Sequence, residues 1–484
     1  MTKVKMEPAE VFACFAEINK IPRPSKKEEK MIEFLKNYGE KLGLETKVDE
    51  VGNVIIRKPA TKGYEDRETT VIQSHMDMVC EKDSNIEFDF MNDPINTEVD
   101  GEWLKAKGTT LGADDGIGVA MELAVLKDDS IEHGPLECVF TRDEETQLTG
   151  ASGMKSGFMT GKYLLNLDSE DEGEIFISCA GGASTKAVFH FNMEEAPKDY
   201  YFFKVGISGL TGGHSGDDIE KKRANANKLL VRFFYNEMKK FDLRISDIQS
   251  GGLHNAIPRD GWAVCAVPMK DKENIRIDAN VYVSEIEEEY SVTEKSLKFY
   301  VESADAADVI EKECAKKIIA SLQAVDNGVF AMSQDIDWLV ETSSNLASIH
   351  KNGNEIEIVT SQRSNIGSAR KNMSATVAAA FELGGAEVFT TDGYPGWKLN
   401  PDSELLKLAV DSYKRLFNKE PKVLAIHAGL ECGLFSERYP HMDMVSFGPT
   451  LRGVHSPEEK LLIPTVEKVW DFLLEILKNI PKKK

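Results

Sequence analysis

The sequence lacks three features that would each place it in a special class of protein. No apolar run in its 484 residues approaches the roughly 18 residues of a membrane-spanning helix. Its seven cysteines are scattered singly without a CxxC pair, which predicts reduced thiols rather than a disulfide framework. Residues 1–7 lack the apolar core of a signal peptide. These absences predict a cytoplasmic protein with no membrane partner.

Basic residues are also scarce. The 59 lysines and arginines face 81 acidic residues, and the resulting net charge of −22 argues against nucleic acid as a partner. The hydrophobic content of 41% and charged content of 29% are typical of a soluble globular protein. A chain of this length is expected to form two or three domains, and its size favours an enzyme.

Strand and helix patterns alternate along the first third of the chain, which predicts an α/β domain with a mostly parallel sheet and helices on both faces. One helix is expected over residues 26–42, with Ser25 as its N-cap. The pattern changes after residue 182. We expect residues 1–182 and 392–484 to form the catalytic domain and residues 183–391 an inserted α+β lid. The lid is long enough for two lobes, and an alternating pattern predicts a strand over residues 275–283.

A histidine and an aspartate end the predicted strand 69–74. His75 and Asp77 are two residues apart, so on an extended chain they point to the same side. Ligand sites of α/β sheets tend to form at such strand ends. Taken alone, such a pair is more often a solvated strand edge than a ligand site.

Further ligand-type side chains follow at predicted strand ends and turns. They are Asp114 and Asp115, Glu144 and Glu145, Asp168, His214 and His455. Each has an ordinary explanation when taken alone: an aspartate as N-cap, an acidic run as a solvated turn, or a histidine in a loop. Together, carboxylates with a few imidazoles suit zinc, manganese or cobalt, and a carboxylate shared by two ions would form a co-catalytic pair.

The order of these motifs resembles that of the co-catalytic zinc family of carboxypeptidase G, aminoacylases, carnosinases and bacterial dipeptidases. The motifs are His75-Met76-Asp77, Gly112-Ala113-Asp114-Asp115-Gly116, Glu144-Glu145, Asp168 and His455. Other segments are similar to the aminoacyl-histidine dipeptidase branch of that family. These are Cys179-Ala180-Gly181-Gly182, Gly212-Gly213-His214-Ser215-Gly216, Asn255-Ala256-Ile257-Pro258-Arg259, His427-Ala428-Gly429-Leu430-Glu431-Cys432-Gly433 and Gly448-Pro449-Thr450.

The resemblance implies two divalent ions, zinc first and cobalt or manganese as alternatives. It assigns His75 and Asp168 to one ion, Glu145 and His455 to the other, and Asp114 to both, with a cis peptide bond between Asp114 and Asp115. Asp77 would orient His75. Glu144 would be the general base that activates a metal-bridging water and later protonates the leaving amine.

The resemblance also implies a role for residues outside the metal centre. His214, assisted by Asn255, would stabilise the oxyanion of the tetrahedral intermediate. Arg363 would bind the carboxylate of the substrate, although it also fits a surface arginine. Glu431 would pair with the substrate amine or cap a helix. The sequence leaves open whether His214 acts in its own chain or in the partner of a homodimer.

The expected substrate is a small unblocked dipeptide, with Xaa-His dipeptides such as β-alanyl-histidine among the candidates. The alternatives are a related aminoacylase, tripeptidase or carboxypeptidase, and, from another class, a non-catalytic metal-binding scaffold. The full ligand set beside Glu144 argues against the scaffold.

Overall fold

The computed structural model describes residues 4–334 and 336–484, which divide into two compact units. The first unit comprises residues 1–178, 397–425 and 431–484, and the second comprises residues 179–396 and 426–430. The sequence predicts these boundaries after residues 182 and 391. The return of residues 426–430 to the second unit was not expected. In the described part of the chain, no helix is both long enough and apolar enough to cross a membrane, and no disulfide joins any of the seven cysteines.

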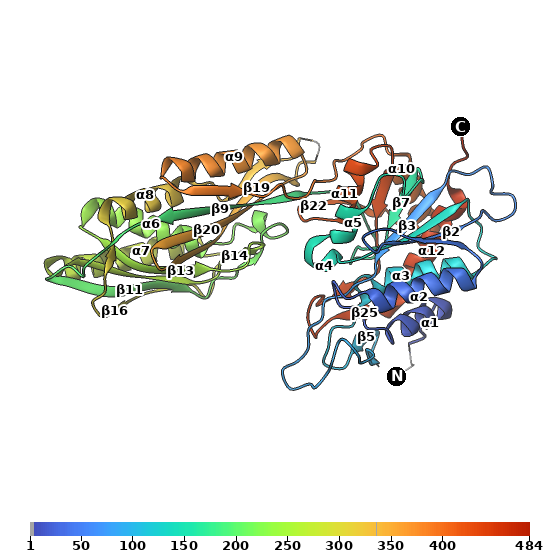
Figure 1. Cartoon of the computed structure of the whole chain (residues 1–484), viewed down its shortest axis with the longest axis horizontal. Helices are drawn as coiled ribbons and strands as arrows, with labels where there is room; N and C mark the ends of the chain where they lie inside the picture. Colours follow the sequence, from blue (N-terminus) through green and yellow to red (C-terminus); the bar gives the residue numbers. More distant parts are fainter. Residues whose placement is uncertain (1–3, 335) are drawn as a thin grey trace. The chain divides into compact units, whose positions relative to one another are not determined.

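The first unit contains, in its described residues, an eight-stranded sheet in the order β1-β2-β6-β3-β7-β23-β8-β22 (Figure 1). The strands are β1 (Glu45–Val48), β2 (Val54–Lys58), β3 (Thr70–His75), β6 (Leu136–Thr141), β7 (Tyr163–Asn166), β8 (Glu174–Cys179), β22 (Lys422–Ile426) and β23 (Asp443–Ser446). The central strands β6, β3, β7 and β23 are parallel, whereas β1, β2 and β8 pair antiparallel toward the edges. The prediction of an α/β unit with a largely parallel core is confirmed.

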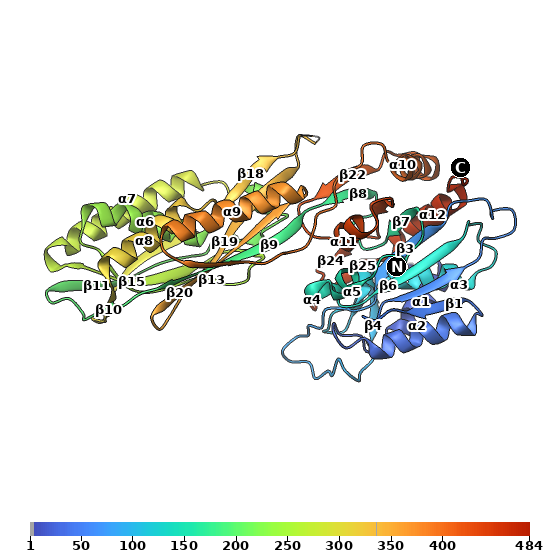
Figure 2. The ribbon, with the colours of Figure 1, turned by 45° about the horizontal axis from the view of Figure 1, so that its top comes forward.

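Helices cover this sheet. The helices are α1 (Ala9–Ile18), α2 (Glu29–Lys41), α3 (Ala113–Lys127), α4 (Glu144–Gln147), α5 (Thr149–Gly153), α10 (Glu404–Phe417), α11 (Glu431–Arg438) and α12 (Ile463–Asn479). Figure 2 shows α1 beside α3, and these helices share one apolar core with α2, α10 and α12. Every residue of β3, β6 and β7 is buried, so both faces of the central sheet are covered and only strand ends are available to a ligand.

A small antiparallel sheet completes the first unit, in the order β24-β25-β5-β4. Its strands are β4 (Thr97–Asp100), β5 (Trp103–Ala106), β24 (Leu451–Arg452) and β25 (Lys460–Leu462). The loop between β24 and β25 contains His455, whose φ of 61° lies in the left-handed region. The sheet therefore anchors both ends of the loop that presents this histidine.

The described residues of the second unit form a nine-stranded antiparallel sheet in the order β16-β11-β15-β13-β19-β20-β9-β21, with β18 paired to β19. The strands are β9 (Gly181–His190), β11 (Tyr200–Ser208), β13 (Arg244–Gly251), β15 (Gly261–Pro268), β16 (Lys298–Ser303), β18 (Gly328–Met332), β19 (Val340–Asn352), β20 (Glu355–Ser364) and β21 (Glu387–Thr390). Two short ladders pair β10 (Met193–Glu194) with β17 (Val309–Ile310), and β12 (Gly213–His214) with β14 (Ala256–Ile257).

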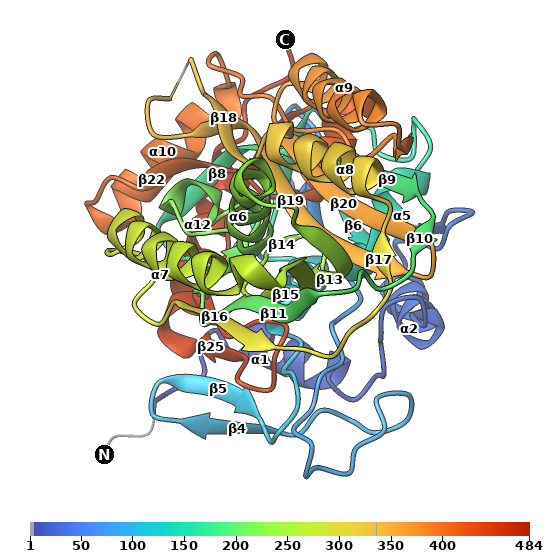
Figure 3. The same cartoon turned by 90° about the vertical axis from the view of Figure 1, so that its left-hand side faces the viewer.

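Four helices pack on one face of that sheet (Figure 3): α6 (Ala226–Lys240), α7 (Lys272–Glu289), α8 (Lys312–Ala324) and α9 (Gly367–Leu383). Two short 3₁₀ turns, Ile219–Lys221 and Met269–Asp271, complete the unit. The helices and sheet enclose one large apolar core, so the unit is one α+β body and the expectation of room for two lobes is not met. The strand predicted over residues 275–283 is wrong, because this stretch lies within α7.

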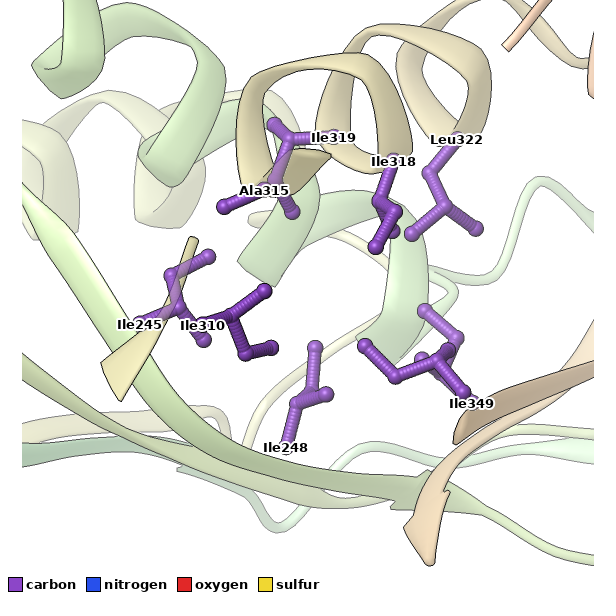
Figure 4. Close-up of a pocket in the computed structure, with 9 residues that line it drawn as sticks. Ile245, Ile248, Ile310, Ala315, Ile318, Ile319, Leu322 and Ile349 are labelled. Atoms are coloured by element: carbon purple, nitrogen blue, oxygen red, sulfur yellow. The ribbon is translucent and has the colours of Figure 1, made fainter. Parts of the chain in front are cut away.

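The core of the second unit contains one gap of about 10 Å³ (Figure 4). Its walls are isoleucine, leucine and alanine side chains from β13, β17, α8 and β19, together with Ile356 of β20. A gap of this size and polarity is at most as large as one water molecule and offers it no hydrogen bond. It is a packing defect and not a ligand site.

Candidate active site

The carboxyl ends of the central parallel strands bring acidic and imidazole side chains together. His75 is the last residue of β3, Glu144 and Glu145 follow β6, and Asp168 follows β7. Parallel strands end at one edge of a sheet, so these side chains converge although up to 93 residues separate them in sequence. Asp114 reaches the same edge from the first turn of α3, where its ψ of 111° is not helical. The Asp114–Asp115 peptide bond is cis, as the resemblance implies.

Asp114 lies between the two histidines, with one carboxylate oxygen toward each. Its Oδ1 is 3.1 Å from His75 Nε2, and its Oδ2 is 3.1 Å from His455 Nε2. The same His75 nitrogen is 3.3 Å from Asp168, and the same His455 nitrogen is 2.9 Å from Glu145. The five side chains thus form two groups that share Asp114.

These groups fit metal ions in geometry and in donor type. Two ligands of one tetrahedral zinc ion lie roughly 3.4 Å apart, which is close to the 2.9–3.3 Å between the nitrogen and oxygen atoms of each group. One atom each of His75, Asp114 and Glu145 lies within 4.8 Å of the others. The buried Oε1 of Glu145 has no hydrogen-bond partner among the described residues, which fits an oxygen that binds a cation.

The electrostatics of the site also favour the binding of a positively charged ion. Hydrogen bonds with Asp114 and Glu145 raise the pKa of His455 to about 11. Burial and the charge of Asp114 raise the pKa of Glu145 to about 7. Burial lowers the pKa of His75, but the charge of Asp168 and its hydrogen bonds more than offset this, so the net shift is well upward. Protons bind tightly wherever carboxylates outnumber cations, and bound divalent ions would replace those protons.

Asp77 connects the two halves of the predicted catalytic machinery. Its Oδ1 is 3.4 Å from His75 Nδ1 and accepts the backbone N–H of Glu144 at 3.0 Å. Its Oδ2 accepts the backbone N–H of Glu145 at 3.3 Å. A single buried carboxylate therefore lies against the His75 imidazole and holds the turn that contains Glu144 and Glu145.

Two residues that support Asp77 were missed in the sequence. Ser25 was predicted as an N-cap, but α2 begins at Glu29, and the Ser25 hydroxyl instead donates to Asp77 Oδ2 at 2.8 Å. Arg23, of which only 1% is exposed, donates to the Asp77 carbonyl at 3.1 Å. Their only local signal is that Arg23 lies between Pro22 and Pro24, and nothing in that pattern points to a contact more than fifty residues away.

Glu431 lies in the first unit but outside the two groups that share Asp114. It is fully buried at the start of α11, and its Oε2 accepts hydrogen bonds from Gln73 at 2.7 Å and from Thr141 at 2.6 Å. Its Oε1 has no hydrogen-bond partner among the described residues. Burial raises its pKa to about 8.

The remaining predicted residues lie in the second unit. Arg363 of β20 is buried, with Nη1 donating to the Tyr394 hydroxyl at 3.1 Å and Nη2 3.3 Å from His214 Nε2. The other ring nitrogen of His214 is 3.1 Å from Asp217. Asn255 precedes β14, the strand that pairs with His214. The structure therefore groups Arg363 and His214 and places Asn255 on the neighbouring segment.

The fold and this constellation define a class of metallopeptidase. Residues 71–479 match the profile of Peptidase family M20/M25/M40, and the chain belongs to this family. It is 42% identical over 481 residues to the cytosol non-specific dipeptidase of Escherichia coli (strain K12), covering 99% of both chains. The crystal structure of aminoacylhistidine dipeptidase from Vibrio alginolyticus superposes with a TM-score of 0.91 at 40% identity, covering 99% of this chain and 98% of that one. The family and branch predicted from the motifs are confirmed.

More distant structures share the fold. A tripeptidase from Staphylococcus aureus superposes with a TM-score of 0.57 at 16% identity, covering 97% of this chain and 98% of that one. At this identity the likeness shows a common architecture and nothing of the substrate.

Proposed function

We propose that this protein is a two-metal dipeptidase that hydrolyses unblocked dipeptides, including Xaa-His dipeptides. The observation that carries the proposal is Asp114, which directs one oxygen to His75 and the other to His455. Asp168 lies beside the same His75 nitrogen, and Glu145 lies beside the same His455 nitrogen. Two ions held in this way, zinc first and cobalt or manganese as alternatives, would polarise the scissile carbonyl and the attacking water.

Glu144 moves the proton in this scheme. It accepts a proton from the attacking water and passes it to the amine nitrogen of the departing amino acid. Burial and the charges of Asp168 and Glu145 raise its pKa well above that of an ordinary carboxyl, although His75 opposes the shift. A carboxyl with this environment can hold the proton between the two steps.

We assign substrate binding to Arg363, His214, Asn255 and Glu431. Arg363 would bind the substrate carboxylate, because a guanidinium forks onto two carboxylate oxygens and its Nε has no partner among the described residues. His214 and Asn255 would stabilise the oxyanion. The unpartnered Oε1 of Glu431 would accept a hydrogen bond from the substrate amine. In this scheme residues 183–391 are the inserted lid domain, and residues 1–182 and 392–484 form the catalytic domain.

Two features support a cytoplasmic location. The E. coli relative is named as a cytosolic enzyme, and seven cysteines without a disulfide suit a reducing compartment. If His214 acts on the active site of a partner chain, the functional protein is a homodimer. Mixing chains that carry Glu144→Ala with chains that carry His214→Ala tests this, because only a shared site would regain activity.

The decisive experiment compares Glu144→Ala with Glu33→Ala, an exposed acid on α2. Both variants should retain about two ions per chain by elemental analysis, and only Glu144→Ala should lose at least about 100-fold in kcat on dipeptides. Comparable turnover in the two variants would refute the base assignment. If the wild-type protein cleaves N-acylated amino acids or tripeptides in place of dipeptides, the related hydrolases are favoured. If the wild-type protein binds metal but turns over none of these substrates, the scaffold is favoured.

A further inference from the structure

Glu459 holds the backbone of the loop that presents Asp114. It lies just before β25 and is 2% exposed. Its Oε2 accepts the N–H groups of Leu111 at 2.7 Å and Gly112 at 3.0 Å. Its Oε1 accepts those of Ala113 at 2.8 Å and Asp114 at 3.3 Å. One carboxylate thus receives four consecutive backbone donors.

These four donors need an external partner. The first N–H groups of a helix have no acceptor within the helix, and burying them unpaired is costly. The residue before α3, Gly112, has no side chain to cap them, and its φ of 67° turns successive N–H groups toward one point. A carboxylate at that point is favoured by its charge as well as by its hydrogen bonds.

The same contact ties together two loops that present metal ligands. Glu459 follows His455 by four residues, and the intervening turn is closed by bonds from Ser456 Oγ to the Gly453 carbonyl at 2.7 Å and from Glu459 N–H to the Ser456 carbonyl at 3.0 Å. His455 and Asp114 are therefore joined through a short rigid turn and the carboxylate of Glu459. This link is independent of the 3.1 Å contact between their own side chains.

Arg23 supports the loop from another side. Its Nη2 donates to the Gly112 carbonyl at 2.7 Å while its Nη1 donates to the Asp77 carbonyl. A Cβ added to Gly112 would lie 2.6 Å from this Nη2, so the close approach of Arg23 requires glycine at this position. With Glu459 on its N–H groups and Arg23 on a carbonyl, the loop has little freedom.

We propose that Glu459 is a positioning residue of the metal centre. It fixes Asp114 against His455 before any ion binds, so that the two ligands of the shared group need no rearrangement. The inference rests on the proposed two-metal function, since it concerns the spacing of that function's ligands. The competing explanation is a plain helix cap that stabilises α3 without affecting metal affinity.

Glu459→Gln separates these explanations, because it preserves shape but turns an amide NH₂ toward two backbone donors. Zn²⁺ affinity is measured by competition with a chromogenic chelator, and the coordination of Co²⁺ by its visible absorption. A positioning role predicts an affinity loss of about 10- to 100-fold and an altered Co²⁺ spectrum. The neighbouring exposed Glu458→Gln is the matched control and should bind both ions as the wild type does. Wild-type Zn²⁺ affinity in Glu459→Gln, with or without a loss of unfolding stability, would overturn the inference.

A measurement on the wild type covers the case in which Glu459→Gln does not fold. Hydrogen exchange at the amides of residues 111–114 should be as slow in the metal-free protein as in the loaded one. Fast exchange that slows only with metal would overturn the inference, because the ions would then be organising the loop. Failure of the wild type to bind two ions or to cleave dipeptides would instead refute the proposed function.

Discussion

Replacing Arg363 by lysine tests how the substrate carboxylate is recognised. Lysine keeps the positive charge but has a single nitrogen, so it cannot contact the Tyr394 hydroxyl, lie beside His214 and fork onto a carboxylate at the same time. The variant should therefore lose one charge-assisted hydrogen bond to the substrate. Such a bond contributes about 1.5–3 kcal/mol, which corresponds to roughly 10- to 150-fold in kcat/KM.

The surroundings of Tyr394 make a second, smaller effect predictable. Its ring is held between two glycines, because a Cβ on Gly182 or Gly429 would approach ring atoms to 2.7–2.8 Å. The ring is thus fixed, and Tyr394→Phe removes only the hydroxyl that positions Arg363. The expected loss is about 1 kcal/mol, or roughly fivefold. Tyr235→Phe, on α6, is the matched control and should leave kcat/KM unchanged.

The assay compares a dipeptide with the same dipeptide carrying a C-terminal amide. If Arg363 binds the carboxylate, Arg363→Lys and Tyr394→Phe reduce kcat/KM for the free acid and have little effect on the amide, which lacks the charged group. Equal losses on both substrates would refute the reasoning, because the arginine would then act on the fold or on the reacting carbonyl.

Three further outcomes follow from other contacts. Burial, together with the charge of Arg363, lowers the pKa of His427 to about 3, so the folded state stays neutral while an unfolded histidine binds a proton below about pH 6.5. The folded state therefore keeps its full stability above about pH 6.5, and its free energy of unfolding should fall by about 2 kcal/mol on acidification to pH 5. Urea unfolding of His427→Gln should lack this pH-dependent loss of stability, whereas the exposed His190→Gln should keep it. Ser25→Ala removes a hydrogen bond to Asp77 and should reduce kcat/KM about fivefold, and an unchanged value would mean that the backbone donors alone orient Asp77. Chelation should lower the unfolding temperature of the first unit only, by the equivalent of about 2.7 kcal/mol per bound ion at a metal concentration 100 times Kd, and Asp114→Asn should abolish the difference in calorimetry.

The grouping of the metal-ligand side chains could be predicted because it follows from topology. His75, Glu145 and Asp168 each end or follow a parallel strand, and parallel strands bring such residues to one edge whatever lies between them. The resemblance added Asp114 and His455, which lie on a helix start and a loop. Their roles in binding metal stay predictions until ions are measured.

Other features could not be predicted because local patterns were ambiguous or contacts were long-range. Residues 275–283 alternate apolar and polar side chains like a strand, yet Ile275, Ala279 and Tyr282 are buried at helical spacing while Ile277 and Val281 are more than half exposed. Ser25 resembles an N-cap in the sequence, and only the fold brings it to Asp77. The local sequence pattern limits the secondary structures and hydrogen bonds that a residue can form, and tertiary contacts determine which of these it adopts.

The return of residues 426–430 to the second unit affects how this architecture can be altered. The Ala180 N–H is 3.1 Å from the Ile426 carbonyl and 2.9 Å from that of Ala428, and His427 Nε2 is 2.7 Å from Ser343 Oγ. The second unit is therefore assembled from two separate pieces of chain. Deleting residues 179–396 would leave the short piece without its partners, and transplanting them into another protein would omit it. A successful domain exchange must therefore carry both pieces together.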